Sequence, residues 1–225
     1  MAEPPSYGDA SELLNSHTLP PVTLRVAGRF VYSDDPQTPP LYELSHSVGF
    51  LRDTHHVVRV QRLQHQVKQL NGAPQVSTRA RHLYDLKHPN HVTAPTFSFH
   101  AEATSRQSLC SFGISSFRPR RLSTARGYRV HRAARGPGHQ LVSQDAIFEA
   151  LPAKDGAVTF EWFDSQSRLL ARELVQGGMA SFLIGAEMSL AARDALVTAW
   201  ILRVWWELAG GQDRWNWWQH AARYQ

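Results

Sequence analysis

The chain has 225 residues, 42% of them apolar, and a formal net charge of +5. That length and apolar share suit one large domain, or two small ones, with a sizeable core. Cys110 is the only cysteine, which excludes an internal disulfide and a cysteine-based zinc site.

The chain offers no targeting or membrane-spanning signal. The segment from Met1 to Pro5 lacks the basic and apolar regions of a secretory signal peptide. No uncharged apolar run reaches the roughly 18 residues of a transmembrane helix. We therefore expect a soluble, cytoplasmic protein without a transmembrane span, and the alternatives are a location at the membrane periphery or in the nucleus.

Residues 1–20 carry proline, serine and aspartate but few large apolar side chains, which predicts a disordered N-terminal tail. From Pro21 onward, short segments alternate apolar and polar residues with the period of a half-buried strand. A polar stretch from Leu63 to Gln75, with an Asn71-Gly72 turn motif, interrupts this pattern. The segments that read as strands are 22–26, 30–32, 42–44, 56–60, 79–86, 97–101, 109–114, 128–131, 158–163, 169–174 and 180–184.

The segment 189–209 reads as one long helix. Ser189 is a good N-cap because its hydroxyl can accept from an early helix N–H, and Gly210-Gly211 is a natural stop. Between Ala195 and Ala209 only three side chains are polar, which leaves no wide polar face of the kind that a surface helix needs. The helix must therefore be buried on nearly all sides, with its core residues Leu196, Trp200, Val204 and Trp205 joined by Trp162 from a strand.

Three environments could bury such a helix. A membrane fits poorly because Arg203 and Glu207 are costly in lipid, and a helical core fits poorly because the chain offers no helical partner. The remaining environment is a closed barrel of antiparallel strands with the helix running through it. The predicted fold class is therefore mainly β, with a barrel domain over residues 21–211 and an aromatic C-terminal tail over 212–225.

Three stretches carry a resemblance to a known superfamily: the hairpin from Phe160 to Ala171, the strand Ala180–Ile184, and the helix segment Asp194–Trp205. Together they resemble the tubby C-terminal-like superfamily, which includes tubby proteins, phospholipid scramblases and plant LURP-one-related proteins. The resemblance spans residues 22 to 210 and implies a barrel of about twelve strands around a C-terminal helix. The chain departs from scramblases in lacking a cysteine cluster and a proline-rich arm, and the tubby phosphoinositide-binding motif does not align residue by residue.

The densest charge run lies between Arg118 and Arg135, where seven arginines fall within 18 residues without an acidic residue. Such a run predicts a phosphate-binding patch for anionic phospholipid headgroups such as phosphoinositides, or for nucleic acid. The alternative is a solvated face whose charges are paired by acids elsewhere in the fold. The candidate anion-binding residues are Arg118, Arg120, Arg121, Arg129 and Arg132. On a strand, Arg129 and His131 would share one face.

Catalysis and metal binding have little support in the sequence. The chain has neither a nucleophile elbow nor a glycine-rich phosphate loop, and Cys110 reads as a small core residue. Five histidines raise the question of a metal site, but no convincing ligand spacing accompanies them beyond Asp85. These histidines are His55, His56, His82, His88 and His91.

We therefore expect a non-enzymatic binding protein without a cofactor or metal. The leading function is binding to anionic phospholipid headgroups at a membrane surface. The alternatives are a protein-interaction module without a small ligand, and nucleic-acid binding through residues 118–135. The tail around Trp215, Trp217 and Trp218 either covers the mouth of the barrel or anchors the protein to a partner or membrane interface.

Overall fold

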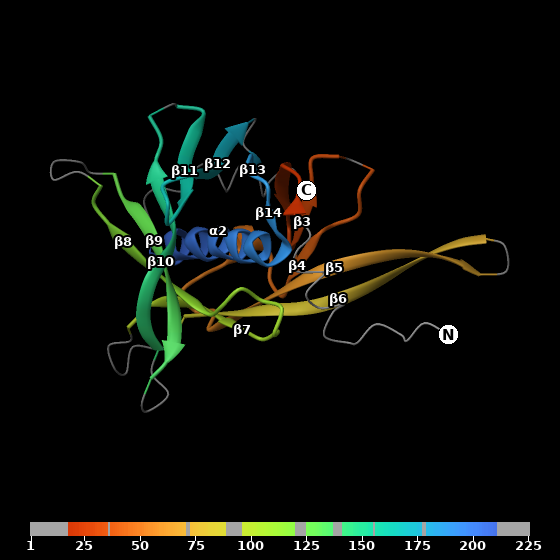
Figure 1. Cartoon of the computed structure of the whole chain (residues 1–225), viewed down its shortest axis with the longest axis horizontal. Helices are drawn as coiled ribbons and strands as arrows, with labels where there is room; N and C mark the ends of the chain where they lie inside the picture. The colour runs from red at the N-terminus through yellow and green to blue at the C-terminus, as the bar shows by residue number, and fades with distance from the viewer. Residues whose placement is uncertain are drawn as a thin grey trace, which may run out of the picture.

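The structure, a computed structural model, describes residues 18–35, 37–70, 73–88, 96–119, 125–136, 141–154, 156–176 and 179–210. Twelve antiparallel strands form a closed barrel around one helix, which confirms the predicted fold class (Figure 1). The barrel strands are β2 (Val22–Ala27), β3 (Phe30–Ser33), β4 (Tyr42–Leu44), β5 (Val57–Leu70), β6 (Ala73–Lys87), β7 (Phe99–Ala103), β8 (Phe112–Phe117), β9 (Gly127–Arg135), β10 (Leu141–Pro152), β11 (Val158–Asp164), β12 (Leu169–Gln176) and β13 (Met179–Ile184).

The barrel follows a simple up-and-down path. Each strand from β2 to β12 pairs with the next strand in the sequence, so short connections suffice throughout. Pairing of β13 with β2, with Phe182 opposite Leu24, closes the ring. A separate two-stranded sheet joins β1 (Thr18–Leu19) to β14 (Met188–Ser189) directly before the helix. Residues 18–20 therefore belong to the fold, and the prediction that placed them in the N-terminal tail was wrong.

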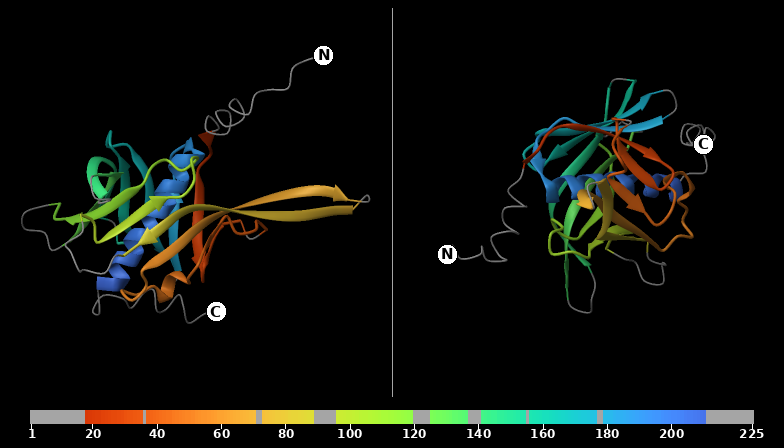
Figure 2. Two further views of the ribbon diagram at one scale, coloured as in Figure 1. Left: turned by 90° about the horizontal axis from the view of Figure 1, so that it is seen from below. Right: turned by 90° about the vertical axis from the view of Figure 1, so that its right-hand side faces the viewer.

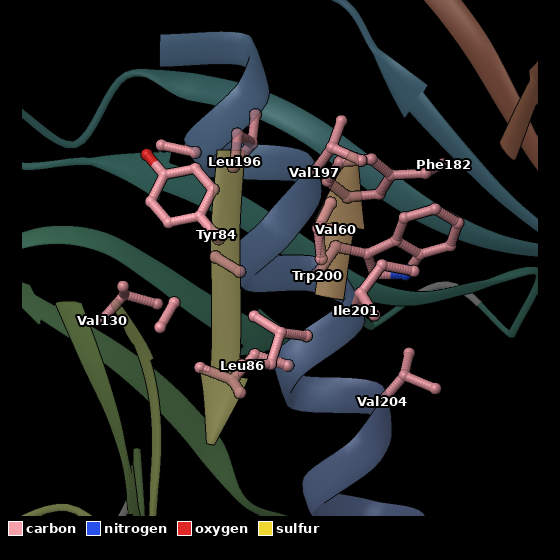
Figure 3. Close-up of a cluster of buried hydrophobic side chains, with 14 of the residues drawn as sticks. Val60, Tyr84, Leu86, Val130, Phe182, Leu196, Val197, Trp200, Ile201 and Val204 are labelled. Atoms are coloured by element: carbon pink, nitrogen blue, oxygen red, sulfur yellow. The ribbon is translucent and has the colours of Figure 1, made fainter. Parts of the chain in front are cut away.

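The helix α2 (Leu190–Gly210) runs through the barrel (Figure 2). The backbone N–H of Ala192 donates to the hydroxyl of Ser189 over 3.3 Å, as the predicted N-cap requires. Trp200 is 1% exposed and its ring stacks on that of Phe182 with 4.6 Å between centroids. Buried apolar side chains from all twelve barrel strands surround the helix. Figure 3 shows some of them, among them Val60, Leu86 and Phe182, beside Trp200 and its neighbours on the helix. The other predicted core residues, each without measurable exposure, are Leu196, Val204, Trp205 and Trp162.

Two ion pairs connect α2 to the barrel wall. Near the start of the helix, Asp194 accepts from Arg62 of β5 and from the hydroxyl of Tyr42, whose oxygen lies 2.9 Å away. Near its end, Arg203 pairs with Glu173 of β12 at 2.5 Å. Because charges buried without partners are strongly destabilising, these two contacts fix both the rotation and the depth of the helix.

Two strand regions differ from the sequence interpretation. Strand β5 continues through Leu70 and pairs with β6 from Ala73 onward, where the sequence predicted a polar interruption. Strand β10 was missed, because residues 142–145 are exposed on both faces and show no alternation. Strands β5 and β10 both extend past the barrel wall, where no core imposes the period of two.

Cys110 lies before β8 and is half-buried, so the prediction of a core cysteine was wrong.

Candidate anion-binding site

The arginine run meets the barrel at the joined ends of β8 and β9. Phe117 pairs with Gly127, and Arg118 and Arg126 flank this last pair, one on each strand. The absence of a side chain at Gly127 makes room for the Phe117 ring, because a Cβ atom at this position would lie 2.8 Å from Cζ of that ring. The Phe117 ring therefore lies across the neighbouring strand, and the two exposed arginines lie next to the last pair of the two strands.

Arg129 is held by two contacts on the outer side of the barrel. Its guanidinium lies over the Phe117 ring, 4.4 Å from the centroid, and donates to Oε1 of Glu149 over 2.7 Å. The side chain nevertheless remains 41% exposed. Glu149 neutralises part of the local charge, and Phe117 keeps the planar guanidinium in one orientation.

The remaining arginines of the run do not join this cluster. Arg132 is exposed but pairs with Phe112, so it extends on the opposite side of β9 from Arg129. Arg135 forms an ion pair with Glu102 at 3.2 Å. Arg120 and Arg121 lie outside the described residues. The candidate cluster thus consists of Arg118 and Arg126 beside the last pair of β8 and β9, with Arg129 two residues along β9 from Gly127 on its outer face, whereas Arg132 lies three residues farther along the strand.

His131 lies on the outer side of β9 with Arg129, as the strand period predicts. Its ring stacks on that of Phe97 with 6.4 Å between centroids. Phe97 in turn covers Gly113, the strand partner of His131. This histidine packs against an aromatic ring and is not part of the arginine cluster.

The cluster lies at the barrel end where α2 ends. The hydroxyl of Tyr128, next to Gly127, donates to Oε1 of Glu207 over 2.7 Å. Burial raises the pKa of Tyr128 well above its ordinary value, the Glu207 carboxylate adds to the rise, and the charge of Arg126 acts against it. Arg126 lies two residues before Tyr128 in the chain and therefore at this end of the barrel.

The same barrel end exposes an aromatic side chain. The short helix η1 (Val48–Phe50) lies beside the end of α2, where the indole of Trp205 donates to the carbonyl oxygen of Arg52 over 2.8 Å (Figure 2). Phe50 is 60% exposed and Val57 is 42% exposed. Sequence reasoning missed Phe50 because a single exposed ring leaves no periodic signal.

The polar side chains proposed for metal binding or catalysis have other contacts. His82 binds Asp85 over 2.9 Å, and the ring of His88 stacks on Phe99. His55 packs edge-on against His46, and His91 lies outside the described residues. Within the described ranges, no three histidine, cysteine, aspartate or glutamate side chains gather as a metal site would require.

Comparison with known proteins adds no relative. No family model, no curated protein and no solved structure matches the chain. Within the described part of the chain, no helix combines the length and the apolar character needed to cross a bilayer.

Proposed function

We propose that this protein is a divergent tubby-like barrel that binds anionic phospholipid headgroups at a membrane surface and has no catalytic role. The observation that carries the proposal is the pair of exposed arginines, Arg118 and Arg126, beside the last pair of β8 and β9, with the oriented guanidinium of Arg129 two residues along β9 from Gly127. Among the described residues, neither Arg118 nor Arg126 forms an ion pair. The architecture of twelve strands around a C-terminal helix supports the superfamily assignment.

The chemistry of the barrel end suits a phosphate-rich surface. A guanidinium binds phosphate through two parallel N–H donors, and each basic residue near an anionic leaflet contributes about 1 kcal/mol. Arg118 and Arg126 therefore supply about 2 kcal/mol together, which gives weak and reversible attachment. Phe50 adds an aromatic ring on the same end, and aromatic rings are favoured at the headgroup level.

The barrel interior supports a binding role over a catalytic one. Glu173 is engaged by Arg203 and by the indole of Trp162, and Asp194 is engaged by Arg62 and Tyr42. Each of these two buried carboxylates is thus occupied by two side chains of the barrel and helix, which supports a structural role for both.

Vesicle co-sedimentation tests the proposal. The double variant Arg118→Gln/Arg126→Gln should bind phosphatidylcholine vesicles containing phosphatidylserine or a phosphoinositide about 30-fold more weakly, because it loses about 2 kcal/mol. The matched control is Arg168→Gln/Arg172→Gln, which removes the same charge from the β11–β12 hairpin and should bind like the wild type.

Three results would contradict lipid binding. The first is a wild-type protein that does not sediment with anionic vesicles, which would favour an interaction module without a small ligand. The second is equal binding to neutral phosphatidylcholine vesicles, and the third is an equal loss in the test and control variants. A Phe50→Ser variant should weaken binding most at high salt, where the arginine contribution is screened.

A further inference from the structure

Strands β5 and β6 form a hairpin that leaves the barrel and projects away from it (Figure 1). Strand β4 pairs with β5 only as far as Arg62, and β7 pairs with β6 only from Tyr84 onward. Residues 64–82 therefore have only each other as ladder partners within the described part of the sheet. We call this two-stranded segment the arm.

The cross-strand register divides the arm into two faces. Gln64 pairs with Arg79, and Gln66 pairs with Ser77, on the same side as the basal pair Arg62 and Arg81. All these side chains are hydrogen-bond donors, and we call this side the donor face. Gln66, Ser77 and Arg79 are exposed on it.

The opposite face is mixed in character. His65 pairs with Thr78 and reaches the carbonyl oxygen of Pro40 over 2.8 Å, so the base of this face rests on the β3–β4 connection. Farther out, Val67 and Val76 pair with each other and are 69% and 63% exposed. The donor face is thus the more polar of the two.

The charged side chains of the arm are basic. No aspartate or glutamate occurs between Thr54 and Tyr84, a segment that carries four arginines and one lysine. Burial lowers the pKa of Arg81, and the neighbouring charges of Arg62 and Arg79 lower it further, whereas only Asp194 opposes them. Asp194 is buried inside the barrel, so the outer part of the donor face has a net positive charge.

We propose that the arm is a docking element for duplex DNA and that its donor face enters the major groove. A two-stranded ribbon fits the major groove of B-form DNA, which is about 12 Å wide. The projecting strands of roughly nine residues span about 30 Å, nearly one helical turn of the duplex. Arginine and glutamine are the side chains that bind guanine and adenine edges there, while serine and arginine also bind phosphates.

The charge and the shape of the arm together favour duplex DNA over other partners. A membrane surface would require apolar side chains on the leading face, and the exposed valines lie on the other side. A protein strand could pair with the open edges of the arm, but edge pairing uses backbone groups and has no need of an acid-free donor face. This site is separate from the barrel end proposed for lipid binding.

Fluorescence anisotropy with a labelled duplex of random sequence tests the proposal. The variant Gln66→Glu/Arg79→Gln changes the donor face by two charge units and should weaken binding at least tenfold. The slope of log K against log salt should become shallower by about 0.9, because residue 79 no longer neutralises a phosphate. The matched control, Val67→Glu/Thr78→Glu, makes the same charge change on the opposite face and should retain most of the affinity.

A shortened arm gives a second variant that preserves the barrel. Replacing residues 66–77 with Asn-Gly joins His65 to Thr78, which are already paired, through a favoured two-residue turn. This variant should unfold at the wild-type temperature and lose duplex binding. Duplex RNA should bind more weakly than DNA to the wild type, since its major groove is too narrow for the ribbon.

The proposal is overturned by several distinct results. Undetectable DNA binding by the wild type would do so, as would equal losses in the donor-face variant and its control, or equal affinity for duplex RNA. Arm variants that lose vesicle binding instead of DNA binding would assign the arm to lipid. Because Arg118→Gln/Arg126→Gln leaves the arm intact, it should keep wild-type DNA affinity whether or not the lipid proposal holds.

Discussion

Arg203 of α2 and Glu173 of β12 form a two-pronged ion pair inside the barrel. The guanidinium donates through Nε over 2.9 Å and through Nη2 over 2.5 Å, and the indole of Trp162 donates to the same carboxylate over 2.8 Å. Burial works against the charge of Arg203, but the carboxylates of Glu173 and Glu207 outweigh it and raise its pKa. The helix is therefore held in the barrel by a contact that tolerates little displacement.

Replacement of Arg203 by methionine should destabilise the protein by about 3 to 5 kcal/mol, because it leaves the Glu173 carboxylate buried without its cation. Urea unfolding followed by tryptophan fluorescence measures the loss. The matched control is Arg172→Met. Arg172 is next to Glu173 in β12, and its ion pair with Glu161 is exposed. That change should cost less than about 1 kcal/mol.

The double variant Arg203→Met/Glu173→Gln separates the charge from the packing. Glutamine still accepts from Trp162 but carries no charge, so much of the stability lost in Arg203→Met should return. A double variant as unstable as the single one would mean that the cost comes from poorer packing and not from an unpaired carboxylate.

Trp200→Ala should cost about 3 to 5 kcal/mol, because it removes a fully buried ring that stacks on Phe182. Phe50→Ala, which truncates an aromatic ring that is 60% exposed, should change stability by no more than about 0.5 kcal/mol. Thermal unfolding of both variants measures the difference. A near-neutral Trp200→Ala would mean that α2 does not form the axis of the barrel.

Gly113→Ala should destabilise the protein by about 1 to 3 kcal/mol through overpacking, because the new Cβ would lie 2.1 Å from Cγ of Phe97. The same substitution at Gly185, where a Cβ meets no heavy atom within 4 Å, should be close to neutral. In a Phe97→Ala background the cost at Gly113 should largely disappear. Persistence of the full cost there would place the strain in the backbone of β8.

The stability of the protein should depend on pH through Asp194. Burial raises the pKa of this carboxyl to about 6, and the contacts with Arg62 and Tyr42 offset only part of the rise. Between about pH 4 and pH 6, the Asp194 carboxyl therefore binds a proton more tightly in the folded state than in the unfolded chain. The contribution of this protonated carboxyl to the free energy of unfolding is largest below pH 4 and is lost as the pH rises to 6. It amounts to about 3 kcal/mol.

Comparison of the wild type with Asp194→Asn isolates this effect. The difference in unfolding free energy between the two proteins should shift by about 3 kcal/mol between pH 4 and pH 7 and then stay constant. Asp164→Asn should give a shift of the opposite sign, because bonds from the backbone of Arg168 and Gln166 outweigh partial burial and lower the pKa of Asp164. A pH-independent difference at Asp194 would contradict the assignment.

Much of the fold could be predicted because burial imposes a period. The helix lacks a polar face, and the Val158–Leu174 hairpin shows both alternation and turn residues, so a barrel around a helix was the one consistent solution. The closing pair of β13 and β2 could not be identified, since residues so far apart in the sequence share no local pattern.

The candidate surfaces were less predictable, because exposed side chains leave no period in the sequence. The sequence located the arginine run, but only the register separates Arg132 from Arg129, and only the fold brings Phe50 to the same barrel end. The arm escaped notice because side chains that face solvent on both sides have no apolar period. The sequence feature that could have indicated the arm is the absence of acidic residues from Thr54 to Tyr84.

The position of α2 at the end of the barrel domain has a consequence for biosynthesis. During translation every barrel strand leaves the ribosome before the helix that fills the interior, and β2 waits for β13 before the ring can close. Until then, inward-facing residues such as Leu24 and Phe112 have no core to enter. Closure of the barrel is therefore a late step of folding, and the nascent chain exposes apolar side chains until β13 and α2 have been made.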